Sequence, residues 1–573
     1  MRKNPKVNGY IISSLLSVTV PKFKHVFFAV LSVSYSVVHA QQLPLYLNQE
    51  YAAYYDQALN SPDESIHTGF KPLIQSQAHL EYNWKNGMYS SNDSINGLTQ
   101  YPVPDQKRSW LYRKLYTENL FIIHDTAEKF WCTIDPLFNF QGSEDRGDSA
   151  RKMYQNTRGF MVQGGIGSKL SFTSSFFENQ ATFPYYVDNF IQSTSVLPGQ
   201  GRAKTLNTQT GGSFYSNGYD FDISESDLSY SPSPYFNFQL GQGKNFIGDG
   251  YRSLLLSDNS FDYPYFKITT TFGKFQYTDM YCLFVNLSND SISKAGIEGL
   301  FQRKAASFQY LSWNVTKRLE WGLFQGLIWQ AANYVTNQQS YNLNYIDPLI
   351  GVNALRYGLG ADNNNVLLGS TVKYKITGNL LAYGQLVIND LGPTESIQNK
   401  TGFQGGLKFY NHLGELLVEY NQVRPYTYTG MNADENYTNY NQALGDPLGA
   451  NFKEFIVSVN VHLAKHFALH LQVNYDVIGE DAPNTNNGSN LLLSDTISVK
   501  NQTAVAQGQG LKGVLNYADG HISYLMNPRT NMNIVMGLSY RELTESSISY
   551  NSPVTMLFYL GFRTSIGNTY YDF

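Results

Sequence analysis

The sequence predicts an all-β protein, a transmembrane antiparallel β-barrel of about 18 strands, between about 16 and 20. Three observations predict this fold: apolar and polar residues alternate over segments of about ten residues, tight turns alternate with long irregular stretches, and charge is scarce. Charged residues make up only 15% of the chain and aromatic residues another 15%, whereas roughly 25% of residues are charged in an average soluble protein.

The hairpin around Lys465 shows the alternation most clearly. Ser458, Asn460 and His462 point to one side of its first arm, and the apolar residues between them point to the other. A period of two indicates a β-strand, and an apolar face opposite a polar face is what a barrel wall in lipid requires. The apolar set of both arms comprises Phe455, Val457, Val459, Val461, Leu463, Phe467, Leu469, Leu471 and Val473.

Two further segments agree with lipid on one side of the wall. Lys373 and Lys375 alternate with apolar neighbours, and we expect both to face the lumen because a lysine facing lipid is costly. In the segment after Lys317, Trp321 and Trp329 lie on the same apolar face. At roughly 3.3 Å per residue, they are about 26 Å apart along the strand. With a strand tilt of about 40°, this becomes about 20 Å across the membrane, close to the separation of two aromatic girdles.

The tight turns set the number of strands. Nine hairpins give eighteen strands and residues 555–565 add one more, whereas a barrel with both ends in the periplasm needs an even number. Either one turn is false or an early strand near residues 79–85 completes the set. Phe573 is expected to close the last strand as a terminal aromatic of the kind that barrel-insertion machinery reads. The turns are expected near Ala127, Ser168, Pro232, Gly273, Lys317, Gly378, His412, Lys465 and Arg529.

Long irregular stretches separate the hairpins. Short turns on the periplasmic side and long extracellular loops on the other are typical of outer-membrane barrels. The stretches cover residues 184–219, 246–262, 331–365, 421–451 and 478–510.

The N-terminus predicts export. An apolar run follows Lys22 and Lys24 and ends at Val38-His39-Ala40, with small residues where a signal peptidase cuts. Its length of about 13 residues is too short for a membrane anchor, which needs about 20. We therefore expect a signal peptide at 1–40 cleaved after Ala40, a periplasmic extension or plug at 41–105, a barrel at 106–573, and location in the outer membrane of a Gram-negative bacterium.

Little in the sequence indicates catalysis or a cofactor. A net charge of −4 gives no reason to expect nucleic acid. Cys132 and Cys282 allow one disulfide at most. His462, His466 and His470 have the spacing of a metal site on a helix, but a hairpin would place His466 in the turn, so no metal and no cofactor are expected. No ordered acid–base or nucleophile motif is present, and we expect no enzyme.

The densest polar run is the glycine-rich segment at residues 241–259, GQGKNFIGDGYRSLLLSDN. It resembles the signature segment of the capsule-assembly (Wzi-like) outer-membrane family and its gliding-motility relatives. The closing FRT…N…YYDF at residues 562–573 is similar to the gliding-motility branch, as is SIHTGFKP at residues 65–72. The resemblance implies a non-enzymatic surface protein that binds or organises exopolysaccharide or capsule, or serves as a cell-surface component of gliding motility.

Four charged residues of this run are the first candidate site. Lys244, Asp249, Arg252 and Asp258 put charge near the barrel mouth, where they either hold an anionic sugar or pin an inward-folded loop. Both interpretations stay open at this stage.

The neighbouring residues predict how this loop folds. Gly248 and Gly250 permit the positive φ of a sharp fold-back. The apolar residues 254–256 are expected to plug the lumen, which favours a closed barrel over an open channel.

A second candidate site lies in the stretch at residues 421–451. Tyr426, Tyr428 and Tyr437 stand among asparagines, and aromatic faces with amides suit sugar rings and also protein surfaces. The alternative is a solvated loop without a ligand.

The expected partners are outer-membrane lipid, surface polysaccharide and other cell-envelope or motility proteins. Two other classes of function remain: a porin or uptake channel, which needs an open lumen, and an embedded hydrolase, which needs an oriented acid–base pair.

Overall fold

The computed structural model describes residues 43–75, 80–83, 88–91, 107–125, 127, 129–147, 151–206, 218–287, 301–333, 338–339, 343–359, 364–392, 397, 399–464, 466–497, 505–545, 554–564 and 567–573. The predicted signal peptide at 1–40 lies outside these residues. Among the residues described, no helix is long and apolar enough to cross a membrane.

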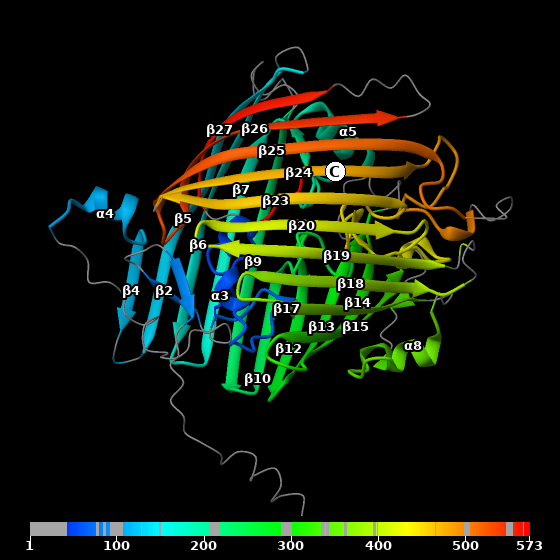
Figure 1. Cartoon of the computed structure of the whole chain (residues 1–573), viewed down its shortest axis with the longest axis horizontal. Coiled ribbons are helices and arrows are strands. Elements are labelled where there is room, and N and C mark those ends of the chain that lie inside the picture. Colours follow the sequence, from blue (N-terminus) through cyan, green and yellow to red (C-terminus); the bar gives the residue numbers. More distant parts are fainter. Residues whose placement is uncertain are drawn as a thin grey trace, which may run out of the picture. The chain divides into compact units, whose positions relative to one another are not determined.

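Eighteen antiparallel strands form the wall and close into a barrel, as predicted (Figure 1). Closure comes from the last strand, β27 (Thr555–Arg563), which pairs with the first, β5 (Phe130–Asp145). The strands between them are β6 (Arg151–Ile166), β7 (Leu170–Ala181), β9 (Gly218–Ser233), β10 (Phe236–Gly243), β12 (Tyr263–Phe272), β13 (Phe275–Asn286), β14 (Gln302–Asn314), β15 (Leu319–Asn333), β17 (Asn365–Lys375), β18 (Leu380–Asp390), β19 (Lys400–Asn411), β20 (Gly414–Val423), β23 (Phe452–Ala464), β24 (Phe467–Glu480), β25 (Leu511–Asn527) and β26 (Met532–Glu545).

The smaller elements lie in the connections and near the two ends of the chain. The helices are α2 (Gln49–Ala52), α3 (Asp56–Leu59), α4 (Trp110–Tyr116), α5 (Tyr185–Thr194), α8 (Val352–Tyr357), η3 (Leu343–Ile346), η4 (Ala433–Glu435) and η5 (Asp495–Ile497). The short strands are β1 (Phe70–Lys71), β2 (Leu80–Asn83), β3 (Met88–Ser91), β4 (Phe121–Asp125), β8 (Lys204–Leu206), β11 (Phe246–Ile247), β16 (Gln338–Gln339), β21 (Thr438–Asn439) and β22 (Gln442–Ala443).

The wall is apolar outside and polar inside. In the hairpin of β23 and β24, Phe455 and Val473 face outward with 43% and 54% of their surface exposed, whereas Ser458 and Asn474 face inward and are buried. Similar outward rows of large apolar residues lie on β19, β26 and β27. Exposure of so large a continuous apolar surface to water is unfavourable, so this surface is the lipid-facing band of a transmembrane barrel.

Each predicted turn joins two paired strands, although Lys465 itself lies outside the described residues. The surplus nineteenth strand is β4, which pairs with residues 130–134 of β5, while β27 pairs with residues 139–145. Strand β4 therefore extends one end of β5 and is not a full wall strand. The predicted early strand does not complete the barrel either, because β2 pairs with β3 in a separate sheet.

Three segments fill the lumen. Residues 43–75, the N-terminal segment, contact inward-facing side chains, with Lys408 Nζ 2.8 Å from Asp56 and the His67 ring 2.7 Å from Ser312 Oγ. Residues 246–262, the lumen loop, join this segment through the pairing of β1 with β11. The third is the C-terminal tail, residues 567–573, whose Asn568 N donates to Leu47 O at 3.1 Å.

The position of the C-terminus differs from the prediction. The last strand ends at Arg563, and the chain then turns back into the lumen, so Phe573 closes no strand. Its ring lies 4.9 Å from that of Phe190 in α5, within the long β7–β9 connection. The tail packs against the lumen loop, where Tyr570 OH donates to Asp258 Oδ1 at 2.7 Å, and does not continue the sheet. Cys132 and Cys282 are both free and form no disulfide.

A further difference concerns the aromatic girdles. Trp321 is 42% exposed as expected, but Trp329 is buried because its ring packs 5.2 Å from that of Tyr345. Tyr345 belongs to residues 343–359, the outer strap, which includes η3 and α8 and lies on the outside of the wall (Figure 1). The strap leaves Leu355 90% exposed on its own outer side.

Candidate functional site

The lumen loop runs through the inside of the barrel, as the sequence predicted. Gly248 has a φ of 136°, which only glycine adopts readily. At Gly250 the constraint is space and not backbone conformation. A Cβ there would lie 2.2 Å from Glu419 Oε2, so the side chain of any other residue would clash. Residues 254–256 are fully buried in the largest apolar cluster, against inward-facing residues such as Phe324 and Val387. The loop therefore plugs this part of the lumen.

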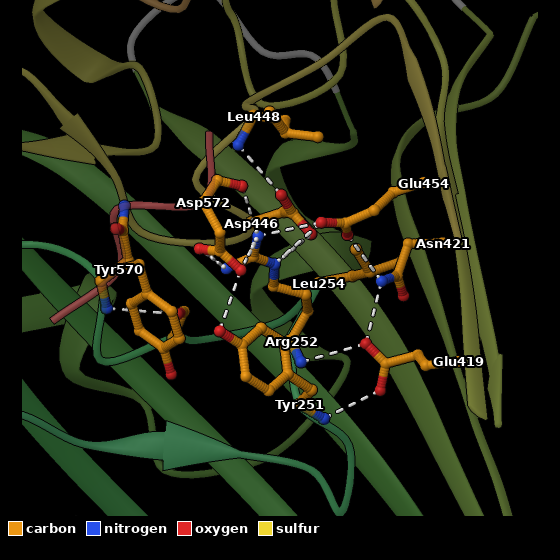
Figure 2. A network of polar contacts seen from close by, with 12 residues as sticks. Tyr251, Arg252, Leu254, Glu419, Asn421, Asp446, Leu448, Glu454, Tyr570 and Asp572 are labelled. Carbon is orange, nitrogen blue, oxygen red and sulfur yellow. Dashed lines mark hydrogen bonds and ion pairs between the residues drawn. The ribbon is translucent and has the colours of Figure 1, made fainter. Parts of the chain in front are cut away.

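Arg252 is the centre of a buried polar network that joins three parts of the chain (Figure 2). Only 1% of its surface is exposed, and its Nη2 donates to Glu454 Oε1 of β23 at 2.9 Å. The same guanidinium lies 3.1 Å from Asp572 Oδ2 of the C-terminal tail and 3.9 Å from Asp446 Oδ2. Its backbone N–H donates to Glu419 Oε1 of β20 at 3.0 Å. One residue thus ties the loop to the wall and the tail.

Charge within the network stabilises the guanidinium. Burial lowers the pKa of Arg252, but the carboxylates of Asp572, Glu454 and Asp446 together raise it well above its usual value. The ring planes of Tyr251 and Tyr570 also face the guanidinium, at 4.9 and 5.2 Å from their centroids. Because so many carboxylates already surround this cation, it has no free face for an anionic sugar.

The other three predicted charges bind other segments of the chain. Lys244 Nζ donates to Gly199 O at 2.7 Å and so holds the β7–β9 connection. Asp258 accepts from Tyr570 OH at 2.7 Å and from Asn568 Nδ2 at 2.9 Å, which fixes the C-terminal tail.

Asp249 holds the N-terminal segment. It accepts from Thr68 Oγ1 at 2.6 Å and lies 3.9 Å from both Lys71 and Lys373. Burial raises the pKa of Asp249, but the two ammonium groups lower it to about 2. Lys373 and its neighbour Lys375 face the lumen, as predicted. Lys244, Asp249, Arg252 and Asp258 therefore do not converge on one site: Lys244 holds the β7–β9 connection, Asp249 holds the N-terminal segment, and Arg252 and Asp258 both hold the C-terminal tail.

The three candidate tyrosines lie in the interior and not on the surface. Tyr426, Tyr428 and Tyr437 are all 0% exposed, so in this conformation none can stack on a surface glycan. The hydroxyl of Tyr428 donates to Leu254 O at 2.7 Å and that of Tyr437 to Leu255 O at 2.5 Å. The stretch at 421–451 folds inward because the rings of Tyr428 and Tyr437 pack with the apolar residues of the lumen loop, whereas the hydroxyl of Tyr426 donates to Asn486 O at 2.7 Å.

Sequence reasoning missed the carboxylates of the network. Glu419 and Glu454 occupy inward positions of β20 and β23, directly in the alternation that identified the strands. A carboxylate on a lumen-facing position was therefore a usable signal. Asp446 and Asp572 lie in irregular segments, where no period indicates direction.

The three histidines form no metal site. His466 lies in the turn and its Nδ1 is 2.8 Å from Leu525 O. The His462 ring stacks on Tyr54 at 4.1 Å, and His470 Nδ1 is 2.7 Å from Asn460 Oδ1. Within the described residues, no group of three or more histidine, cysteine or acidic side chains could hold a metal ion.

A cavity of about 320 Å³ remains between the plug and one side of the wall. The strands β5, β6 and β23–β27 line one side, and the N-terminal segment and the C-terminal tail line the other. The lining extends from Asn531, in the tight turn after β25, to Pro184, in the long β7–β9 connection, and therefore reaches both rims.

No family model and no curated protein sequence matches the chain. Among solved structures, the chain is similar to Wzi of Escherichia coli, described as a carbohydrate-binding outer-membrane β-barrel involved in group 1 capsule assembly, with 14% identity over 75% of this chain and 85% of that one and a TM-score of 0.44. It is also similar to OprD of Pseudomonas aeruginosa, with 10% identity over 77% and 95% and a TM-score of 0.40. OpdK of Pseudomonas aeruginosa, in a structure with vanillate, has 8% identity over 75% and 98% and a TM-score of 0.41.

Similarity at these scores carries no argument about function, and the fold rests on the strand pairing of this chain itself. A closed antiparallel barrel with an apolar outer band is the architecture of proteins in the outer membrane of Gram-negative bacteria.

Proposed function

We propose that this chain is a non-enzymatic outer-membrane protein that binds or organises surface exopolysaccharide or capsule, or serves as a cell-surface component of gliding motility. The observation that carries the proposal is the lumen itself, which the N-terminal segment, the lumen loop and the C-terminal tail occupy together. Buried ion pairs and hydrogen bonds fix these segments, so the barrel is built to be stable with its centre filled. A filled barrel suits a surface-holding role better than bulk diffusion.

The sequence resemblance to the capsule-assembly family supports the same proposal. Three segments carry it: residues 241–259 are the lumen loop with its approach, residues 562–573 are the end of β27 with the tail, and residues 65–72 lie in the N-terminal segment. The first two meet at Arg252 and Asp572, and the third joins the first where β1 pairs with β11. The three resembling segments are therefore parts of one structural unit.

The test is a comparison of cells with and without the protein. We expect removal of the protein to lower cell-bound polysaccharide or gliding speed at least threefold, and re-expression to restore it. Unchanged polysaccharide retention and unchanged motility, with the surface otherwise intact, would contradict the proposal.

One observation favours a second function, an uptake channel for small polar molecules: the cavity lining reaches both rims of the barrel. Single-channel recording in planar bilayers separates the two functions. The surface-holding role predicts low conductance in the wild type, whereas a steady open conductance would favour the channel.

A further inference from the structure

We infer that the lumenal cavity between the plug and strands β5, β6 and β23–β27 is a binding subsite for a neutral, hydroxyl-rich glycan segment. This inference rests on the proposed polysaccharide function and gives it a location that the sequence did not indicate. The cavity has a volume of about 320 Å³, which lies at the lower end of the roughly 300–1,000 Å³ that small-molecule sites occupy.

The charged groups around the cavity are already neutralised by one another. Glu50 of α2 lies 2.9 Å from Arg563 Nη2 and 3.3 Å from His521 Nε2. The other ring nitrogen of the same imidazole, Nδ1, lies 3.0 Å from Asp519 Oδ2. The charge of Asp572 is directed at Arg252, at 3.1 Å. A strongly anionic or cationic ligand would therefore find no unpaired counter-charge here.

The remaining lining offers neutral hydrogen-bonding groups. Gln141 and Ser143 of β5 and Ser539 of β26 face the cavity. Amides and hydroxyls both donate and accept, which matches sugar hydroxyl groups. Two buried acceptor or donor atoms at the cavity, Asn139 Oδ1 and His462 Nε2, have no hydrogen-bond partner among the residues described. Because such buried polar atoms are costly when unpaired, they favour a polar ligand.

The N-terminal segment and the C-terminal tail form the opposite side of the subsite. Asn48 and Gln49 border the cavity from α2 and its cap, and Thr569 and Tyr570 border it from the tail. A glycan bound here would contact the wall and both ends of the chain at once. Binding would then stabilise the filled state of the barrel.

The decisive experiment measures binding of maltotriose and of polysaccharide extracted from the producing cells to detergent-solubilised full-length protein by calorimetry. Two variants alter the subsite: Gln141→Leu/Ser539→Val removes neutral polar groups, and Ser143→Phe fills the space. The matched control is Ser171→Ala/Thr173→Val, which removes inward-facing hydroxyls of β7 outside the cavity.

We expect both subsite variants to bind the neutral probes at least tenfold more weakly, with the control unchanged and thermal unfolding of all variants close to wild type. The charged comparator trigalacturonate should bind at least tenfold more weakly than maltotriose. Equal loss of binding in the control, or equal affinity for trigalacturonate, would overturn the inference. If the cell polysaccharide binds wild type and subsite variants alike, the subsite is wrong and the proposed function stands. If the wild type binds no polysaccharide at all, the polysaccharide function fails, and the subsite with it.

Discussion

Arg252 shows how much of the plug depends on a single side chain. Its guanidinium is buried between Glu454 of the wall and Asp572 of the tail, and its backbone is held by Glu419. A buried ion pair is often no more stable than apolar packing would be, but removal of one partner leaves the other charge unpaired. The arrangement therefore specifies one position for the loop and the tail.

Replacement of Arg252 by Met should destabilise the protein by about 3–5 kcal/mol, because the carboxylates of Glu454, Asp572 and Asp446 lose their buried partner. Thermal unfolding in detergent and protease cleavage of the C-terminal tail measure the effect. The control is Lys244→Met, which removes one hydrogen bond to Gly199 O and should cost about 1 kcal/mol. Equal losses in both variants would contradict the central role of Arg252.

Because of Asp249, docking of the N-terminal segment is weakened by acid. Its pKa is about 2 in the folded protein against an ordinary 3.8, so the stabilisation is complete above about pH 4 and is lost as the pH falls toward 2. The shift corresponds to about 2 kcal/mol. In Asp249→Asn, the unfolding midpoint measured between pH 5 and pH 2.5 should fall less than in the wild type. An equally steep fall in both proteins would assign the acid sensitivity to other carboxylates.

At the scale of elements, the C-terminal tail blocks part of the lumen. It follows β27, contacts the N-terminal segment at Leu47, binds Arg252 in the centre, and ends against Phe190 of α5. Because it contacts both other lumen segments and also the wall, where Gln472 and Asn474 of β24 donate to Asp572, the tail holds the filled state together.

Truncation after Thr564 should open part of the lumen. We expect single-channel conductance to rise at least threefold, since the cavity would merge with the space that the tail occupies. Barrel assembly, measured by heat-modifiable migration on gels, should be retained because the wall pairing ends at Arg563. Full-length Thr569→Ala is the control. Wild-type conductance in the truncated protein would mean that the other two segments seal the barrel alone.

The outer strap covers polar residues on the outside of the wall. Gln309 and Gln325 face outward from β14 and β15 yet are 0% exposed. Gly351 N donates to Gln325 Oε1 at 2.8 Å, and Ser307 Oγ donates to Tyr345 O at 2.8 Å. The strap therefore shields polar wall residues from lipid, where unpaired polar groups would be costly.

Replacement of residues 343–359 by a short Gly-Ser linker should lower stability because Gln309 and Gln325 would face lipid. Addition of Gln309→Leu/Gln325→Leu to the shortened protein should restore much of the loss. Urea midpoints in lipid vesicles measure both. If the leucines give no recovery, the strap stabilises the barrel through its own packing and not through shielding.

At the scale of the whole molecule, the barrel wall separates two solvents. Leu538→Arg on the lipid face of β26 should cost about 2–4 kcal/mol near the bilayer midplane, because Leu538 is 61% exposed to the outside. The adjacent Ser539→Arg points into the polar cavity and should cost less. Folding free energies in vesicles compare the two, and a greater cost at Ser539 would reverse the assigned faces.

The local pattern of the sequence determined the barrel, its turns, the direction of Lys373 and Lys375, and a lumen loop with a buried leucine run. The wall, its turns and the lysine directions follow from a period of two and from the different preferences of lipid and lumen, whereas the buried leucine run follows from three consecutive apolar residues, which favour burial without any period. Only the tertiary structure decided that Tyr428 and Tyr437 face inward, that the tail returns through the lumen, and that Asp572 meets Arg252 across 320 positions of the chain. Irregular segments have no period to show direction, and their contacts are chosen by packing among distant parts of the chain.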